Sequence, residues 1–385
     1  RDLVRSRGLG DVYKRQGLNW VSDNFGWWLV LFALILVLLV FGLAFSKAGD
    51  VVIGGAGAKP EYTMWQWFSM SLKGGIGTGI LFWAMGEPIF HMAAPPAAAG
   101  AQPFTREAGL FAISQTMLHW TIAQYAMYSL CAVGVALMAY NRRRTISVSS
   151  IFEPYLSSSV YGVVKTVVPM VSLFCIVGAL ACSMAVGLMQ INSGLNFFFG
   201  LPIDGVTVFA IAAIMVTVYV VSCLTGIKKG MRVLSSFCTI VFIGLMVYVL
   251  CLGPTRFIVD AGTESLGVFF NRFFEHSVIL PTMAENETWS KSWIIMFMAS
   301  FFVYAPIIGL FLARLGKGRT VREFIFMNIG APTLFCIVWI AIWGGTTVWL
   351  QYTGIMDVWQ SVNEKGLEVT IFTILSTLPL SLIQI

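Results

Sequence analysis

Long apolar runs recur along almost the whole sequence, and they constrain the fold more than any other feature. Nine segments have the composition of a membrane span or part of one: 27–45, 65–92, 106–140, 163–198, 205–224, 232–252, 290–313, 324–350 and 367–385. A helix of about 20 apolar residues crosses the roughly 30 Å hydrocarbon layer of a bilayer. A membrane β-barrel would instead show short segments of alternating hydrophobicity. The sequence therefore predicts an all-α polytopic membrane protein.

The composition excludes the soluble classes of protein. Hydrophobic residues make up 58% of the chain and charged residues only 11%, with a net charge of +6. Soluble domains carry about 25% charged residues. Basic clusters follow the third, fifth and seventh segments, at Asn141–Arg144, Lys228–Arg232 and Arg314–Arg322. Because all three follow odd-numbered segments, we expect them on one side, the cytoplasm, and we predict no nucleic-acid partner.

Both ends of the sequence are abrupt. Residues 1–16 are basic, without the apolar core or cleavage signature of a signal peptide, and we interpret them as an artefact or tag-like tail. The final segment, 367–385, stops within an apolar run. We therefore expect a fragment truncated at both ends. Between the sixth and seventh segments, Thr263–Leu280 has the pattern of an amphipathic interfacial helix.

The second segment contains a glycine run at its middle. The stretch 73–79 reads KGGIGTG, and each glycine costs a helix about 1 kcal/mol relative to alanine. A helix that unwinds at membrane depth must line a cavity or be packed in protein, and such breaks form binding sites in secondary transporters. We predict that Gly75, Gly77 and Gly79 border a binding site. The alternative is a small-residue packing face, because Gly75 and Gly79 have Gly-x-x-x-Gly spacing.

The third segment carries aromatic residues that could share one side of a helix. Trp120, Tyr125 and Tyr128 lie at i, i+5 and i+8. Aromatic faces around a cavity hold a quaternary ammonium by cation–π attraction, at about 0.5–2 kcal/mol per ring. Ordinary packing between membrane helices is the alternative. We interpret the neighbouring His119 as a hydrogen-bonded structural histidine rather than a ligand.

The seventh segment and the loop after it carry a family resemblance. Tyr304–Phe324 resembles the signature of the betaine/choline/carnitine transporter family, most closely over GKGRTVREF at Gly316–Phe324. The glycine run with the following Gly86-Glu87-Pro88, and then His119-Trp120, resemble other motifs of this family in the expected order. The resemblance covers about residues 18–385.

The resemblance implies a leucine-transporter-type fold, with two inverted repeats of five helices. Its domains would be an extra helix and loop at 17–60, a first repeat at 61–256, the interfacial helix and loop at 257–285, and an incomplete second repeat at 286–385. The aromatic box of the family would map onto Trp120, Tyr125 and Tyr128, and onto Phe301 and Tyr304. Family members usually have tryptophan at the latter two places, so this box is smaller and attracts cations more weakly.

The implied function is secondary transport by alternating access. The implied substrate is a small quaternary ammonium or zwitterionic compound of the glycine betaine, choline or carnitine class, carried across the plasma (inner) membrane by a homotrimer. The smaller box leaves another small zwitterion, such as an amino acid, as an alternative. An intramembrane enzyme is the rival from another class. The histidines (His91, His119 and His276) lie on different elements without a shared ligand pattern, so we predict no catalytic group, metal site or cofactor.

Lys73 is the candidate ion-coupling residue. It lies 11 residues beyond Tyr62, or about 16 Å along a helix, where a charge costs at least about 2.5 kcal/mol. The resemblance implies that this part of the chain faces a sodium position. We expect Lys73 to occupy that position or compete for it, giving sodium-independent exchange or proton coupling. The alternative is a lysine that faces an aqueous vestibule without a coupling role.

Other polar and aromatic residues have simpler interpretations. We expect Glu87 to cap a half-helix before Pro88. The charged residues of the last basic loop should anchor that loop: Arg319, Arg322 and Glu323. Four tryptophans near span ends should be interface anchors: Trp65, Trp67, Trp289 and Trp293.

Overall fold

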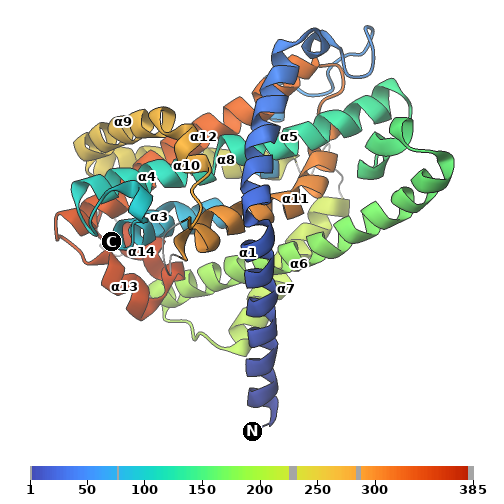
Figure 1. Cartoon of the computed structure of the whole chain (residues 1–385). Helices are drawn as coiled ribbons and strands as arrows, with labels where there is room; N and C mark the ends of the chain where they lie inside the picture. The colour runs from blue at the N-terminus through green and yellow to red at the C-terminus, as the bar shows by residue number, and fades with distance from the viewer. Residues whose placement is uncertain (1, 76–77, 225–231, 283–287, 380–385) are drawn as a thin grey trace.

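In the computed structural model of the chain, helices form every regular element among the described residues, 2–75, 78–224, 232–282 and 288–379 (Figure 1). Side chains are described in these ranges except at 2–15, 73–75, 78, 223 and 232. The α-helices are α1 (Asp2–Phe45), α2 (Met64–Gly75), α3 (Thr78–Ala93), α4 (Arg106–His119), α5 (Ile122–Ala136), α6 (Ser158–Phe199), α7 (Gly205–Leu224), α8 (Arg232–Leu252), α9 (Thr255–Asn271), α10 (Phe273–Ser277), α11 (Met296–Ala313), α12 (Val321–Tyr352), α13 (Val358–Lys365) and α14 (Thr370–Ser376). Two π-helical segments, η3 (Leu137–Asn141) and η6 (Lys291–Ile295), adjoin α5 and α11.

Seven described helical stretches are long and apolar enough to cross a membrane. They are Gln16–Phe45, Arg106–Asn141, Ser158–Phe199, Gly205–Ser222, Val233–Leu252, Lys291–Ala313 and Val321–Tyr352. The predicted polytopic all-α class is therefore confirmed. Two of the nine predicted segments are not in this set. The second is described only on either side of residues 76–77, as α2 and α3, and the described part of the last contains a short apolar helix, Leu367–Ser376.

One helix interruption that matters for the site lies within the described residues, and the other expected one lies outside them. Helix α2 ends at Gly75 and α3 begins at Thr78, so the point where we expected unwinding, residues 76–77, lies outside the described residues. The third predicted segment is also broken, which the sequence pattern did not predict. Helix α4 ends at His119, and Thr121 has a non-helical backbone conformation (φ −125°, ψ −119°) before α5 begins. Trp120 lies at this break.

Two of the three basic clusters meet on one side of the molecule. The Asn141 side chain accepts from Gly54 N at 2.8 Å and donates to Val52 O at 2.9 Å. The loop after α1, which contains Val52 and Gly54, also pairs with the connection between α11 and α12. There Gly318 N donates to Ile53 O at 2.8 Å. In Figure 1 the end of α1 and this connection lie together at the top. The predicted common side is therefore confirmed for these two clusters, while residues 225–231 lie outside the described residues.

The long helix α12 is central to the packing. It contacts α2, α3, α4, α5, α8 and α9, and α11 packs mainly against α5. Most side chains of α6 and α7 are exposed and apolar, as expected for surfaces that face lipid. The predicted amphipathic helix begins earlier than expected and breaks at Arg272, giving α9 and α10. Its buried face includes Ile258 and Phe269, whereas Val259 and Phe270 are exposed.

Candidate functional site

Trp120, at the helix break in the third predicted segment, packs against α11 in the seventh predicted segment. Its indole ring contacts Phe297 and Phe301 of α11 edge to face, with centroids 5.3 and 6.1 Å apart. Tyr128 contacts Phe301 at 6.5 Å, and Tyr125 contacts Tyr128 at 6.3 Å. Four of the predicted box residues are thus brought together from two separate parts of the chain. We call Trp120, Tyr125, Tyr128, Phe297 and Phe301 the aromatic wall.

Sequence reasoning missed Phe297, which lies at the centre of this wall. Its ring also contacts His119 at 4.9 Å and Trp293 at 6.1 Å. The available signal was its i, i+4 spacing with Phe301, which places both on one face of α11. Every residue of the aromatic wall is buried, and the rings touch one another. A ligand can therefore lie between them only after they separate.

Gly79 lies close to the tryptophan of the wall. A Cβ atom built on Gly79 would come within 2.8 Å of Trp120 Cη2 and 3.2 Å of Cζ3, closer than real contacts allow. Glycine is therefore the residue that lets α3 approach this ring. The surroundings of Lys73 and Gly75 and the whole of Gly77 lie outside the described residues.

Two predicted box residues make contacts away from the wall. The Tyr304 hydroxyl donates to Ala179 O at 2.7 Å and lies 2.7 Å from Ser183 Oγ, so it is held by α6. The Tyr125 hydroxyl lies 3.3 Å from Cys336 Sγ in α12. Tyr304 thus joins α11 to α6, and Tyr125 joins the wall to α12.

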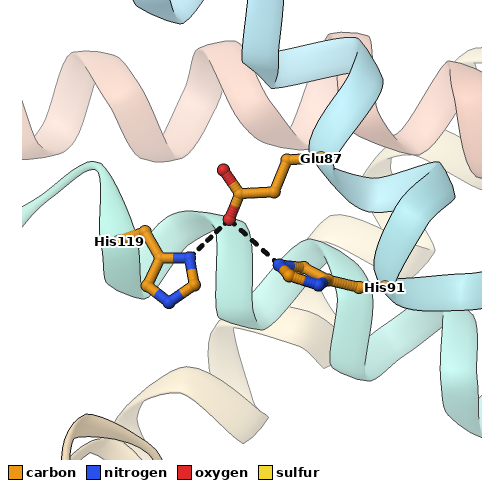
Figure 2. Close-up of side chains that lie close together, drawn as sticks. All are labelled: Glu87, His91 and His119. Carbon is orange, nitrogen blue, oxygen red and sulfur yellow. Dashed lines mark hydrogen bonds and ion pairs between the residues drawn. The ribbon is translucent and has the colours of Figure 1, made fainter. Parts of the chain in front are cut away.

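A buried cluster of polar side chains lies directly behind Trp120. One oxygen of Glu87, Oε1, accepts from His119 Nδ1 at 2.5 Å and from His91 Nε2 at 3.1 Å (Figure 2). The other oxygen, Oε2, accepts from Trp120 Nε1 at 2.7 Å. The three side chains of Figure 2 are fully buried. We call Glu87, His91 and His119 the carboxylate cluster.

The carboxylate cluster has partners on two further elements. Trp289 Nε1 donates to His91 Nδ1 at 3.1 Å, and Gln115 Nε2 lies 3.0 Å from His119 Nε2. These contacts correct three expectations. Glu87 lies inside α3 and is not a helix cap. Trp289 and Trp67 are both buried and are not interface anchors. His91 and His119, which lie on different helices, converge on the same carboxylate. His119 is hydrogen-bonded, as expected.

The carboxylate cluster has the composition of a metal site but not its geometry. Two ligands of one zinc ion lie about 3.3 Å apart when the bonds are about 2.0–2.1 Å long. Glu87 Oε1 and His119 Nδ1 are only 2.5 Å apart, the distance of a strong charge-assisted hydrogen bond. In addition, the Trp289 N–H occupies the lone pair of His91 Nδ1, which leaves a proton rather than a lone pair on Nε2. The residues fit a hydrogen-bonded carboxylate and do not fit a metal.

The basic loop after α11 is anchored as predicted. Arg319 lies over the Trp67 ring at 4.8 Å and donates to Tyr62 O at 3.2 Å. Glu323 forms a capping box with Thr320 at the start of α12. Arg322 donates to Ala44 O at 2.8 Å, at the end of α1. These side chains hold the loop against the first two segments.

Seven described helical stretches that are long and apolar enough to span a membrane, packed around a buried aromatic wall backed by a carboxylate, are the features of a multi-pass membrane protein. The sequence profile of the betaine/carnitine/choline family transporters matches residues 3–385. The chain belongs to this family, whose members are transporters and not enzymes.

Known relatives show the range of the family. A probable glycine betaine transporter of Desulfitobacterium hafniense is 29% identical over 94% of this chain and 71% of its own length. An osmo-dependent choline transporter of Acinetobacter baylyi is 30% identical over 86% of this chain, which spans about half (48%) of that protein. An ectoine/hydroxyectoine transporter of Virgibacillus pantothenticus is 28% identical over 95% of this chain and 72% of its own length.

Proposed function

We propose that this protein transports a small quaternary ammonium or zwitterionic compound by alternating access, with the aromatic wall as its binding site. The observation that carries the proposal is the contact of Trp120 with Phe297 and Phe301, at a helix break, from a separate part of the chain. Aromatic faces attract an onium group without a counter-charge. Relatives named as glycine betaine and choline transporters support this substrate class.

The closed aromatic wall fits one step of an alternating-access cycle. Its rings are buried and touch, so substrate entry requires α5 and α11 to move apart on one side of the membrane. The neighbouring contacts of Tyr304 with α6 and of Arg319 with Trp67 would break or shift in such a movement. Two inverted repeats, at 61–256 and 286–385, are the arrangement we expect to produce it.

We also propose the environment and assembly that the family resemblance implies. The protein would act in the plasma (inner) membrane as a homotrimer, with the loops at 46–60 and 314–322 in the cytoplasm. Lys73 would be the ion-coupling residue that replaces sodium. Cross-linking of the protein in native membranes tests the trimer, and a band at the dimer mass alone would contradict it.

Uptake of labelled compounds into proteoliposomes tests the transport function. Glycine betaine, choline and carnitine are offered singly, and counterflow is measured by preloading the vesicles with the same unlabelled compound. Labelled compound should enter preloaded vesicles faster than empty ones. Counterflow that is indistinguishable from protein-free vesicles for every compound would contradict the proposal.

A zwitterion without a quaternary ammonium is the second candidate substrate. The observation that favours it is Phe301, which attracts cations less strongly than tryptophan, together with a Tyr304 hydroxyl that is bound to α6. Relatives named for ectoine and for proline transport show such substrates elsewhere in the family. Competition of labelled glycine betaine by unlabelled proline or ectoine distinguishes the two candidates.

A further inference from the structure

The protonation state of His91 follows from its hydrogen bonds. An indole N–H can only donate, so Trp289 Nε1 at 3.1 Å requires a lone pair on His91 Nδ1. His91 is therefore a neutral imidazole with its proton on Nε2, directed at Glu87 Oε1. A second proton on His91 would have to be on Nδ1, and its N–H would then face the N–H of Trp289. This histidine is a fixed donor to the carboxylate.

His119 is not fixed in the same way. Its Nδ1 donates to Glu87, and its Nε2 faces the side-chain amide of Gln115 at 3.0 Å. An amide can present either its NH₂ group or its oxygen. The Gln115 oxygen is buried without another hydrogen-bond partner, so turning the amide breaks no other bond. His119 can therefore be neutral, with the amide donating, or an imidazolium, with the amide oxygen accepting.

The carboxylate cluster can thus gain one proton without leaving a donor unpaired. With His119 neutral, the ionised Glu87 gives the cluster a net charge of −1. With His119 protonated, the Glu87–His119 pair is neutral overall. Burial favours the paired state because an uncompensated charge in a low-dielectric interior is costly.

The carboxylate cluster is also connected to the aromatic wall. Glu87 Oε2 accepts from Trp120 Nε1 at 2.7 Å, so the same carboxylate that shares the proton holds the indole ring in place. A change in the charge on Glu87 alters the strength of this bond. Equally, a ligand that moves Trp120 alters the proton affinity of the pair, because linkage between two binding events is reciprocal.

We propose that the Glu87–His119 pair binds one proton in the transport cycle and links its binding to substrate binding through Trp120. This proposal rests on the proposed transport function and adds the driving ion and its site. The ligand is the proton itself. The predicted process is cotransport of one proton with each substrate molecule.

Few other titratable groups among the described residues face this pair. His91 lies on α3, and His276 of α10 lies beyond Phe111, whose ring it contacts at 5.3 Å. Burial lowers the pKa of His276, which favours its neutral form. Three charged side chains on other neighbouring elements have partners of their own: Arg106 with Glu264, Lys291 with Asp23, and Glu364 with Gln360. Glu107 of α4 is exposed at the start of that helix.

A pH gradient across proteoliposomes tests the proposal. The vesicles have equal sodium on both sides, a membrane potential clamped at zero with potassium and valinomycin, and a medium one pH unit more acidic than the lumen. The wild type should accumulate glycine betaine or proline about tenfold, because one pH unit corresponds to a tenfold ratio for one proton. For Glu87→Gln the ratio of uptake with the gradient to uptake without it should fall to about one.

The matched control is His276→Gln, which removes the remaining histidine near the pair but no member of the carboxylate cluster. Its gradient ratio should equal that of the wild type. Counterflow by the wild type with no response to the pH gradient would overturn the proton site and leave the transport function standing. A Glu87→Gln ratio equal to the wild-type ratio would also overturn it. Absence of counterflow for every compound would instead contradict the transport function.

A measurement on the wild type alone covers the case in which Glu87→Gln does not fold. Substrate is added to the protein in weakly buffered detergent solution at several pH values, and protons taken up or released are recorded. The infrared difference spectrum should show a change in carboxyl or imidazole bands. Substrate binding without proton exchange at any pH from about 5 to 9 would overturn the proposal.

Discussion

At the scale of single residues, Trp120 has two roles that one substitution cannot separate. Its ring forms the aromatic wall, and its N–H donates to Glu87. Trp120→Leu and Trp120→Phe both remove the N–H, but only phenylalanine keeps an aromatic face. We expect the apparent affinity for an onium substrate to be about tenfold weaker in Trp120→Leu than in Trp120→Phe, or about 1.4 kcal/mol.

Uptake as a function of substrate concentration measures this difference. Trp65→Leu is the control, because Trp65 is exposed at the start of α2 and should not affect affinity. Equal affinities of the two Trp120 variants for every onium compound would show that cation–π attraction is not used at this position.

Gly79 gives a second prediction at this scale. The Cβ of Gly79→Ala would lie 2.8 Å from the Trp120 ring, which cannot rotate away without losing its bond to Glu87. We expect uptake to fall by about tenfold, since small displacements of binding groups have large effects. Gly178→Ala in α6 is the matched control, because a Cβ there meets no atom within 4 Å. Equal uptake by both variants would mean that the ring is free to move.

At the scale of elements, Arg322 ties α12 to the end of α1. Its guanidinium donates to Ala44 O at 2.8 Å and Ser46 O at 3.3 Å, and pairs with Asp50 at 2.8 Å. The ion pair is half exposed and contributes little. Ser46 O also accepts from Gly49 N, whereas Ala44 O lies in the last turn of α1, where carbonyls lack intrahelical donors, and is bonded by Arg322. We expect Arg322→Ala to lower the free energy of unfolding by about 1–2 kcal/mol.

Thermal unfolding in detergent measures this effect as a lower Tm. Arg322→Lys should restore little of the lost Tm, because one ammonium group cannot make the several hydrogen bonds of the planar guanidinium group. The control is Arg256→Ala, whose side chain is 96% exposed and lies 3.7 Å from Asp260. If both alanine variants had the Tm of the wild type, the contact with α1 would not stabilise the fold.

At the scale of the whole molecule, the question is which ion drives the cycle. If Lys73 takes the place of sodium, uptake by the wild type should not depend on sodium. Lys73→Ala should then abolish exchange or make it sodium-dependent. A sodium titration of counterflow by the two proteins measures this. Strong sodium dependence in the wild type that the substitution leaves unaltered would contradict the assignment of Lys73.

The sequence alone determined the class of protein, the approximate spans and the family. These properties depend on features that are local in the chain: apolar runs, basic clusters between them, and the motif at Gly316–Phe324. The positions of Trp120, Tyr128 and Phe301 also followed from motifs, and the structure places them in contact.

Only the tertiary structure decided the environment of each polar residue. Glu87 was expected to cap a helix because Pro88 follows it, yet its partner His119 lies 32 residues away, and Trp289 lies 198 residues from His91. The helix break at Thr121 contains no glycine or proline by which the sequence could have predicted it. The Tyr304 hydroxyl bonds to α6 and not to the aromatic wall. Helical periodicity predicts which residues share a face of one helix, but the neighbouring helix decides which polar groups meet. In a bilayer a buried carboxylate must find its donors within the protein, so these distant contacts, and not the local pattern, set its role.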